Sequence, residues 1–80
     1  MRLPRDLSGS DLAQVLRKLG YSITRQTGSH LRLTTHEHGE HHLTIPLHAP
    51  LRIGTLSAIL ADVSVHFKLS REQLFETLFG

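Results

Sequence analysis

The 80-residue sequence predicts an α+β fold, a small two-layer domain of order α-β-β-β-α-α with helices on one face of a three-stranded antiparallel sheet. Two observations carry this prediction. Apolar residues recur at helical spacing near both ends of the chain, and apolar and polar residues alternate between positions 21 and 46. In a sheet made of such strands, only the apolar face has to be buried against helices. We therefore expect the other face of the sheet to meet water.

Residues 1–7 are expected to form a short lead-in, followed by a first helix over about 9–19. Ser8 is a suitable N-cap, and Asp11 three residues later completes a capping box. Gly20 directly after the helix suits a left-handed C-cap. The buried side of this helix has the spacing i, i+3, i+4, i+7 and comprises Leu12, Val15, Leu16 and Leu19.

Three strands are expected over about 21–26, 30–35 and 41–46, with a hairpin loop at 36–40. Folding the hairpin about this loop pairs Leu31 with Ile45 and Leu33 with Leu43 on the side that faces the helices. The same register gives three pairs on the open face: His30 with Pro46, Arg32 with Thr44, and Thr34 with His42. In the first strand we expect Tyr21, Ile23 and Arg25 on the helix side, with Arg25 escaping the core at the end of the strand, and Ser22, Thr24 and Gln26 on the other side.

The segment between Pro46 and Pro50 is expected to be irregular, because the residue before a proline is driven to extended conformations. A second helix should follow over about 54–67. A third should begin after Ser70, with Gln73 as its capping-box partner. Its apolar residues Phe75 and Phe79 belong either to the packing or to an interface. The expected core comprises Leu12, Leu16, Leu31, Leu33, Leu43, Ile45, Leu56, Ile59 and Leu60.

Composition points to a single domain over residues 1–80. The absence of cysteine excludes disulfides and thiolate metal sites, and it fits a cytoplasmic protein. No apolar run is long enough for a membrane span, and the first six residues lack the apolar segment of a signal peptide. A net charge of +2 and a pI of about 9.7 permit a nucleic-acid partner without demanding one.

The turn Thr27-Gly28-Ser29 brings a histidine to the first position of the second strand. Gly28 is expected to take the positive φ that tight hairpin turns need. If Leu31 and Leu33 face the core, His30 shares the open face with Arg32. Free imidazole titrates near neutrality, so an exposed histidine on a rigid strand is a candidate acid–base group. The alternative interpretation is an inert surface residue.

Other residues at this end of the sheet are candidates for binding a phosphate. Arg32 is able to hold one bidentately, and the start of the second helix, with Arg52, Gly54 and Thr55, offers free backbone N–H groups. His48 follows Pro46 by two residues and is either a second proton-transfer group or a loop residue that bonds the local backbone. For Arg32 the alternative is a solvated arginine without a ligand. For the start of the second helix the alternative is a simple helix cap.

Six of the seven histidines lie between positions 30 and 48. The cluster His36, His38, His41 and His42 raises the possibility of zinc. However, it lacks ordered finger-type spacing, and strand alternation sends neighbours to opposite faces. We expect a polar hairpin tip, with no metal and no cofactor. A histidine-rich metal-binding protein remains an alternative function.

An ordered set of short motifs resembles the HicA family of bacterial toxins over about residues 8–61. The set comprises Ser8-Gly9, Gly28-Ser29-His30, Ile45-Pro46-Leu47-His48, and Gly54-Thr55-Leu56 followed by Ile59-Leu60. The element order also matches that of double-stranded-RNA-binding domains, to which this family's fold is similar. The chain departs from the family pattern in its lengthened second helix, its third helix and its lysine-poor loops.

The resemblance implies an mRNA interferase, a toxin-type endoribonuclease neutralised by a HicB-like antitoxin. By analogy the family's catalytic histidine falls on His30, and His48 remains the second candidate on the grounds given above. The RNA-binding residues would be Gly28, Ser29, Arg32, Arg52, Gly54 and Thr55. The alternative is a non-catalytic RNA-binding module of the same fold. A homo-oligomer is compatible with either function.

Overall fold

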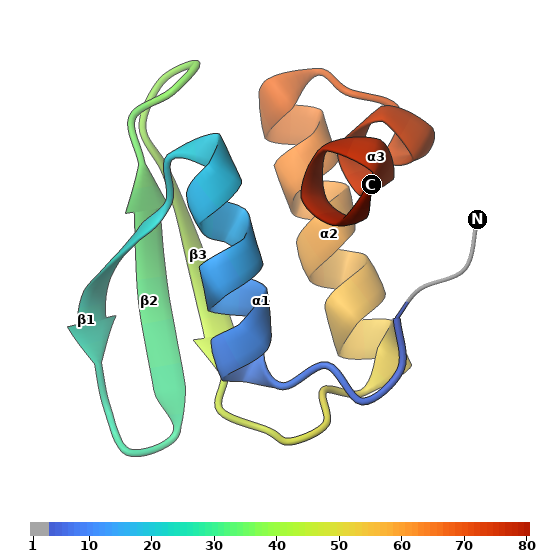
Figure 1. Ribbon diagram of the computed structural model, residues 1–80. Coiled ribbons are helices and arrows are strands. Elements are labelled where there is room, and N and C mark those ends of the chain that lie inside the picture. The colour runs from blue at the N-terminus through green and yellow to red at the C-terminus, as the bar shows by residue number, and fades with distance from the viewer. Residues whose placement is uncertain (1–3) are drawn as a thin grey trace.

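The computed structural model describes residues 4–80, so the first three residues of the expected lead-in lie outside the described part. The elements are α1 (Gly9–Leu16), a 3₁₀ turn η1 (Arg17–Leu19), β1 (Ser22–Gln26), β2 (His30–Thr35), β3 (His41–Pro46), α2 (Ile53–Phe67) and α3 (Arg71–Phe79). The sheet is antiparallel with strand order β1-β2-β3. The predicted α+β architecture is confirmed (Figure 1).

The first helix begins and ends where its capping residues predict. Ser8 Oγ accepts from the backbone N–H of Asp11, and an Asp11 carboxylate oxygen accepts from the Ser8 N–H, which completes the capping box. The helix tightens to 3₁₀ geometry at Arg17, and Gly20 ends it with φ at 81°. The predicted helix over 9–19 is therefore an α-helix with a 3₁₀ last turn.

The predicted register of β2 and β3 is confirmed at every pair. Leu31 lies opposite Ile45 and Leu33 opposite Leu43, while His30, Arg32 and Thr34 pair with Pro46, Thr44 and His42. Both leucines of β2 are buried, and His30 and Arg32 are exposed. The alternation of β2 therefore puts His30 on the open face, as expected.

The helices cover one face of the sheet (Figure 1). The α1 helix contacts all three strands, α2 contacts β3, and α3 packs against both α1 and α2. Each of the nine residues expected in the core is buried. Two further leucines, Leu74 and Leu78, come from α3, and the Lys18 ammonium donates to the Leu78 carbonyl at 2.9 Å. The third helix is therefore part of the fold.

The expected alternation of the first strand is wrong for its last two residues, Arg25 and Gln26, because the strand contains a β-bulge. Pairing with β2 shifts between Ile23 and Arg25, so that Arg25 lies opposite Arg32 and Gln26 opposite Leu31. Gln26, not Arg25, is thus on the helix side, where it lines a hollow of about 450 Å³ between β1 and α1. Ile23 lines the same hollow and is 53% exposed, because α1 covers this edge strand only partly.

The irregular segment after β3 and the last two helices follow the expected boundaries closely. The α2 helix begins one residue earlier than predicted, and Lys68 ends it at a φ of 55°. Ser70 and Gln73 form the predicted capping box of α3. None of the described helices combines the length and apolar character needed to cross a membrane.

Candidate functional site

Thr27 builds the turn that carries His30. Its Oγ1 accepts from the backbone N–H groups of Ser29 and His30, at 3.3 and 3.1 Å, and its own N–H donates to the His30 carbonyl at 3.0 Å. Gly28 does not adopt the expected positive φ. The Thr27 side chain supplies the turn's hydrogen bonds instead, which is the usual role of a short hydroxyl residue in a turn. Gly28 is exposed, and a Cβ there would meet nothing within 4 Å.

The His30 imidazole is exposed and held on one side only. Its Nδ1 lies 2.8 Å from Ser29 Oγ, whereas Nε2 has no hydrogen-bond partner among residues 4–80. When Nδ1–H donates to Ser29, Nε2 of the neutral ring is free to accept a proton, and the imidazolium that forms keeps the same hydrogen bond to Ser29 and carries the transferred proton on Nε2. Ser29 thus orients the ring in both states, and Nε2 faces solvent as either base or acid.

Three backbone hydrogen bonds hold the segment after β3, one to this turn and two to the chain at the start of α1. The Leu47 N–H donates to the Ser29 carbonyl at 2.8 Å, the Gly9 N–H to the His48 carbonyl at 2.9 Å, and the Leu51 N–H to the Leu7 carbonyl at 2.7 Å. The β1–β2 turn, residues 46–52 and the starts of α1 and α2 lie at the same end of the molecule (Figure 1). His48 is exposed and lies at this end with His30.

The close approach of α1 to residues 45–48 requires a glycine. A Cβ on Gly9 would overlap the carbonyl oxygen of Pro46 and lie 3.3 Å from the Ile45 side chain. Gly9 is buried at this contact. The residue that begins α1 thereby helps to position the backbone of His48.

The open face of the sheet carries two arginines beside His30. Arg32 is two residues along β2 from His30, and the bulge places Arg25 directly opposite Arg32 on the neighbouring strand. Both are exposed. Sequence reasoning missed Arg25, because the simple alternation of β1 assigns it to the helix side, and no local signal marks the bulge.

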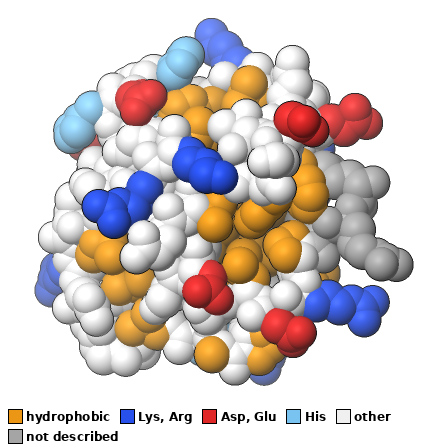
Figure 2. Space-filling view, in the orientation of Figure 1, with side chains coloured by type: hydrophobic (Ala, Val, Ile, Leu, Met, Phe, Trp, Pro, Cys, Tyr) orange, Lys and Arg blue, Asp and Glu red, His pale blue; other side chains and the backbone are white. Residues whose placement is uncertain are grey.

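The start of α2 has the free N–H groups that were expected of it. Its N-cap residue, Arg52, makes no side-chain capping bond, so the first-turn donors have no side-chain acceptor there. Arg52 and Gly54 are exposed and Thr55 is half-buried. Charge is not concentrated on the side of the molecule that Figure 2 shows. On this face, acidic and basic side chains are interspersed and form no patch of a single sign.

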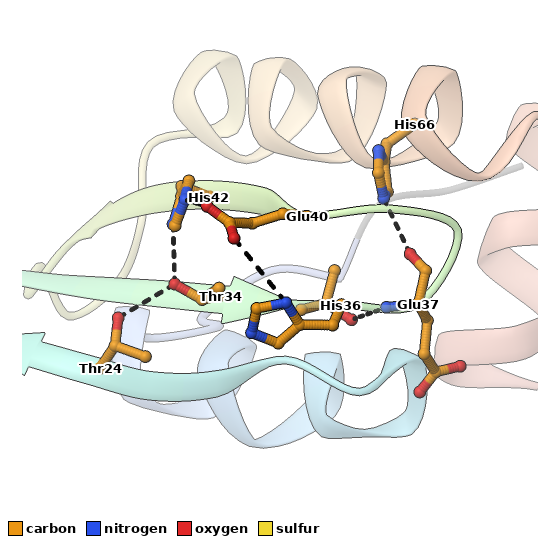
Figure 3. A network of polar contacts seen from close by, with 8 residues as sticks. Thr24, Thr34, His36, Glu37, Glu40, His42 and His66 are labelled. Atoms are coloured by element: carbon orange, nitrogen blue, oxygen red, sulfur yellow. Dashed lines mark hydrogen bonds and ion pairs between the residues drawn. The ribbon is translucent and has the colours of Figure 1, made fainter.

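The histidines at the opposite end of the sheet are engaged in hydrogen bonds. His42 Nδ1 lies 2.8 Å from Thr34 Oγ1, which in turn lies 3.1 Å from Thr24 Oγ1, so that the chain of contacts crosses all three strands (Figure 3). His42 Nε2 lies 2.7 Å from a Glu40 carboxylate oxygen. This hydrogen bond and the charge of His42, with a smaller contribution from His36, lower the pKa of Glu40.

A second histidine group packs between β3 and α2. The Tyr21 hydroxyl lies 2.7 Å from His41 Nδ1, and His41 Nε2 lies 3.2 Å from Asp62. Burial, together with the charge of Asp62, raises the pKa of Tyr21, so the phenol stays protonated beside Nδ1. His41 also stacks on His66, with ring centroids 4.3 Å apart. These contacts join the hairpin to α2.

The described residues contain no group of three histidine, aspartate or glutamate side chains arranged to hold a metal ion. In the hairpin cluster, His42 is bonded to Glu40 and His41 to Tyr21 and Asp62, while His38 lies against the Phe67 ring. Their partners are protein groups from the hairpin loop, from the residue before β1 and from α2. The cluster therefore contributes to packing and hydrogen bonding between these elements.

Comparison with known families identifies a match over most of the chain. A family model described as HicA toxin of bacterial toxin-antitoxin matches residues 9–65. Comparisons with curated proteins and with solved structures give no significant match. The matched range runs from the first residue of α1 through most of α2 and includes the β1–β2 turn, His30 and His48. Because this range is well over half of the chain, the protein belongs to the HicA toxin family, the toxins of HicA/HicB toxin–antitoxin systems.

Proposed function

We propose that this toxin is an endoribonuclease that cleaves mRNA without a metal ion, with His30 as its acid–base group. The observation that carries the proposal is the arrangement at His30. Its ring is oriented through Nδ1 by Ser29, and its Nε2 is open to solvent on a face that also carries Arg32. Membership of a toxin family supports it. We expect the enzyme to act in the cytoplasm, where mRNA is found.

The reaction requires one group that accepts a proton and one that donates a proton. Neutral His30 removes the proton from a ribose 2′-hydroxyl, and the 2′-oxygen attacks the adjacent phosphorus. The bond from phosphorus to the 5′-oxygen breaks, and an acid protonates that oxygen. The products are a 2′,3′-cyclic phosphate and a free 5′-hydroxyl. Positioned acid–base catalysis contributes typically about 10² to 10⁴-fold for each group.

We assign the second proton transfer to His48. Leu47 is half-buried against the core and its N–H donates to the Ser29 carbonyl, so the segment that carries His48 lies beside the turn that carries His30. Gly28 and Ser29 would lie beside the bound RNA at the turn. Arg32 and the start of α2, with Arg52, Gly54 and Thr55, would contact its phosphates.

Incubation of the purified protein with RNA in EDTA tests the proposal. We expect cleavage by the native protein and the loss of most activity in His30→Ala. The matched control is His36→Ala, which removes an exposed histidine at the opposite end of the sheet and should cleave as the native protein does. RNA that is bound but not cut by the native protein would contradict the enzymatic assignment. That outcome would indicate a non-catalytic RNA-binding module.

The pH–rate profile tests the role of His48 separately. If both histidines transfer protons, the profile is bell-shaped, and His48→Ala flattens the limb that belongs to its own proton transfer. An unchanged rate and profile in His48→Ala would show that His30 works with water, an arginine or the backbone. Sedimentation of the free protein would show whether it acts as a monomer or a homo-oligomer.

A further inference from the structure

The β-bulge in β1 creates a pair of like charges on the open face of the sheet. Without it, Arg25 would follow Tyr21 and Ile23 to the helix side. The shift between Ile23 and Arg25 turns the arginine outward, directly opposite Arg32. Bulges that re-aim a side chain in this way are frequent beside functional sites.

Thr24 holds the bulge in place. Its Oγ1 donates to the Arg32 carbonyl at 3.3 Å and lies 3.1 Å from Thr34 Oγ1, which His42 contacts from the other side. These side-chain contacts connect β1 to β2 at the point where the pairing shifts. The position of Arg25 is therefore built into the sheet and does not depend on the conformation of a free loop.

The arginine pair has an electrostatic cost that nothing in the described structure offsets. Like charges directly opposite each other on antiparallel strands destabilise a sheet. The ion pairs among residues 4–80 all lie elsewhere and join His36, His41 and His42 to Glu40 and Asp62. Neither guanidinium is paired with a carboxylate in this part of the chain. An unbalanced pair of this kind is suited to an anion from outside the protein.

We propose that Arg25 and Arg32 together form one phosphate-binding site, which holds a phosphodiester of the RNA strand whose neighbouring linkage His30 cleaves. The Cα atoms of directly opposed residues lie about 4.5 to 5.5 Å apart, so both guanidinium groups are able to reach one phosphate. His30 is two residues from Arg32 on the same face, about 7 Å along the strand. This site rests on the proposed ribonuclease function for its substrate and adds Arg25 to the residues that bind it.

Binding measurements in a His30→Ala background test the site without cleavage of the probe. The probe is a short single-stranded RNA oligonucleotide, and its affinity is measured at several salt concentrations. We expect Arg25→Ala and Arg32→Ala each to weaken binding by about tenfold. Each substitution should also make the plot of the logarithm of the association constant against the logarithm of the salt concentration less steep, by about 0.7. Arg17→Ala, which removes an exposed arginine from η1 on the helix side, is the matched control and should change neither quantity.

A double-mutant cycle then distinguishes one shared phosphate from two separate contacts. With one phosphate, the double variant Arg25→Ala/Arg32→Ala loses clearly less affinity than the product of the two single losses; strict additivity would overturn the shared site. Arg25→Lys should recover the salt slope but not the full affinity, because lysine lacks the bidentate fork. In urea, Arg25→Ala should unfold no earlier than the native protein, since it removes a repulsion.

The outcomes for this site and for the ribonuclease function are separable. Arg25→Ala that binds RNA as tightly as Arg17→Ala would overturn the phosphate site, even if the native protein cleaves RNA and His30→Ala does not. Conversely, arginine-dependent binding by a native protein that leaves the RNA intact would support the site and contradict the ribonuclease.

Discussion

Single residues at the β1–β2 turn and at the start of α1 determine how the two histidines are presented. Thr27 closes the turn with its side chain, Ser29 orients the His30 ring, and Gly9 lets α1 dock against the backbone of Pro46 and His48. Gly9 occupies a position that excludes a side chain, because a Cβ there would overlap the Pro46 carbonyl oxygen. The addition of a single methyl group at Gly9 should therefore affect both the stability of the protein and the position of the site.

We predict that Gly9→Ala destabilises the protein by about 1 to 3 kcal/mol, the usual cost of overpacking. The added Cβ overlaps the Pro46 carbonyl oxygen, which is backbone and has little room to move. Gly54→Ala is the control, because a Cβ there meets nothing within 4 Å and alanine is the better helix former. Urea unfolding of both variants measures the difference. Equal midpoints for the two would show that α1 does not press on this segment.

Glu40 should make the stability of the protein depend on pH in acid. Its pKa is lowered below the ordinary 4.5, chiefly by the hydrogen bond from His42. A carboxyl with a depressed folded-state pKa contributes stability above its unfolded pKa, and this contribution is lost as pH falls through the folded value. We therefore expect Glu40→Gln to lower the urea midpoint near neutral pH, and the difference from the native protein to vanish in acid.

A titration of the Glu40 carboxyl by NMR provides the control for this prediction. In His42→Ala, which removes the hydrogen bond and the charge that cause the shift, the pKa of Glu40 should rise toward its ordinary value. If Glu40 titrates at the same pH in both proteins, the contact with His42 is not formed in solution.

At the scale of elements, the central and edge strands of the sheet differ in how much they contribute to the core. Leu33 on β2 is completely buried, whereas Ile23 on β1 is 53% exposed, although both point to the helix side and the register pairs them. The reason is the packing against the helices: the apolar residues of β2 are buried beneath them, whereas Ile23 on β1 lines an open hollow beside α1.

We predict that Leu33→Ala costs about 2 to 5 kcal/mol of unfolding free energy, a large part of the stability of so small a domain. Ile23→Ala should cost about 1 kcal/mol or less, since much of that side chain is already in water. Urea denaturation of the two variants tests the contrast. Similar losses would show that α1 covers both strands equally in solution.

At the scale of the molecule, the two ends of the sheet have different chemistry. One end carries His30, His48 and the arginines on an open surface, and the other carries histidines bonded to protein groups. The family implies a HicB-type antitoxin. Among the described residues no segment covers His30, so a partner that binds this face would be the direct means of silencing it.

We predict that the antitoxin covers His30 and the neighbouring open face, with Arg32 and the start of α2 at or near the interface. Diethylpyrocarbonate should modify His30 in the free toxin and leave it unmodified in the complex. His36, an exposed histidine at the opposite end, should react in both and is the internal control. Full modification of His30 within the complex would contradict the masking of this face.

Local patterns in the sequence were sufficient for most of the fold and for the position of His30. The caps of α1 and α3 depend on residues three apart, and the β2–β3 register follows from four alternating apolar residues around a short loop. A shift of one residue would turn every leucine of the hairpin to water. The exposure of His30 follows from the same alternation, so the sequence by itself determined which face carries it.

The tertiary structure alone decided the features that depend on contacts between distant segments. The bulge at Thr24 is held by hydrogen bonds to β2, so the outward position of Arg25 is invisible in the alternation of β1. The exposure of Ile23 depends on where α1 lies, and the place of His48 depends on bonds to Ser29 and Gly9. The alternation of apolar and polar residues in the sequence indicates which side of a strand is apolar. Bulges, helix coverage and loop anchoring arise from packing between elements, which a local pattern does not contain.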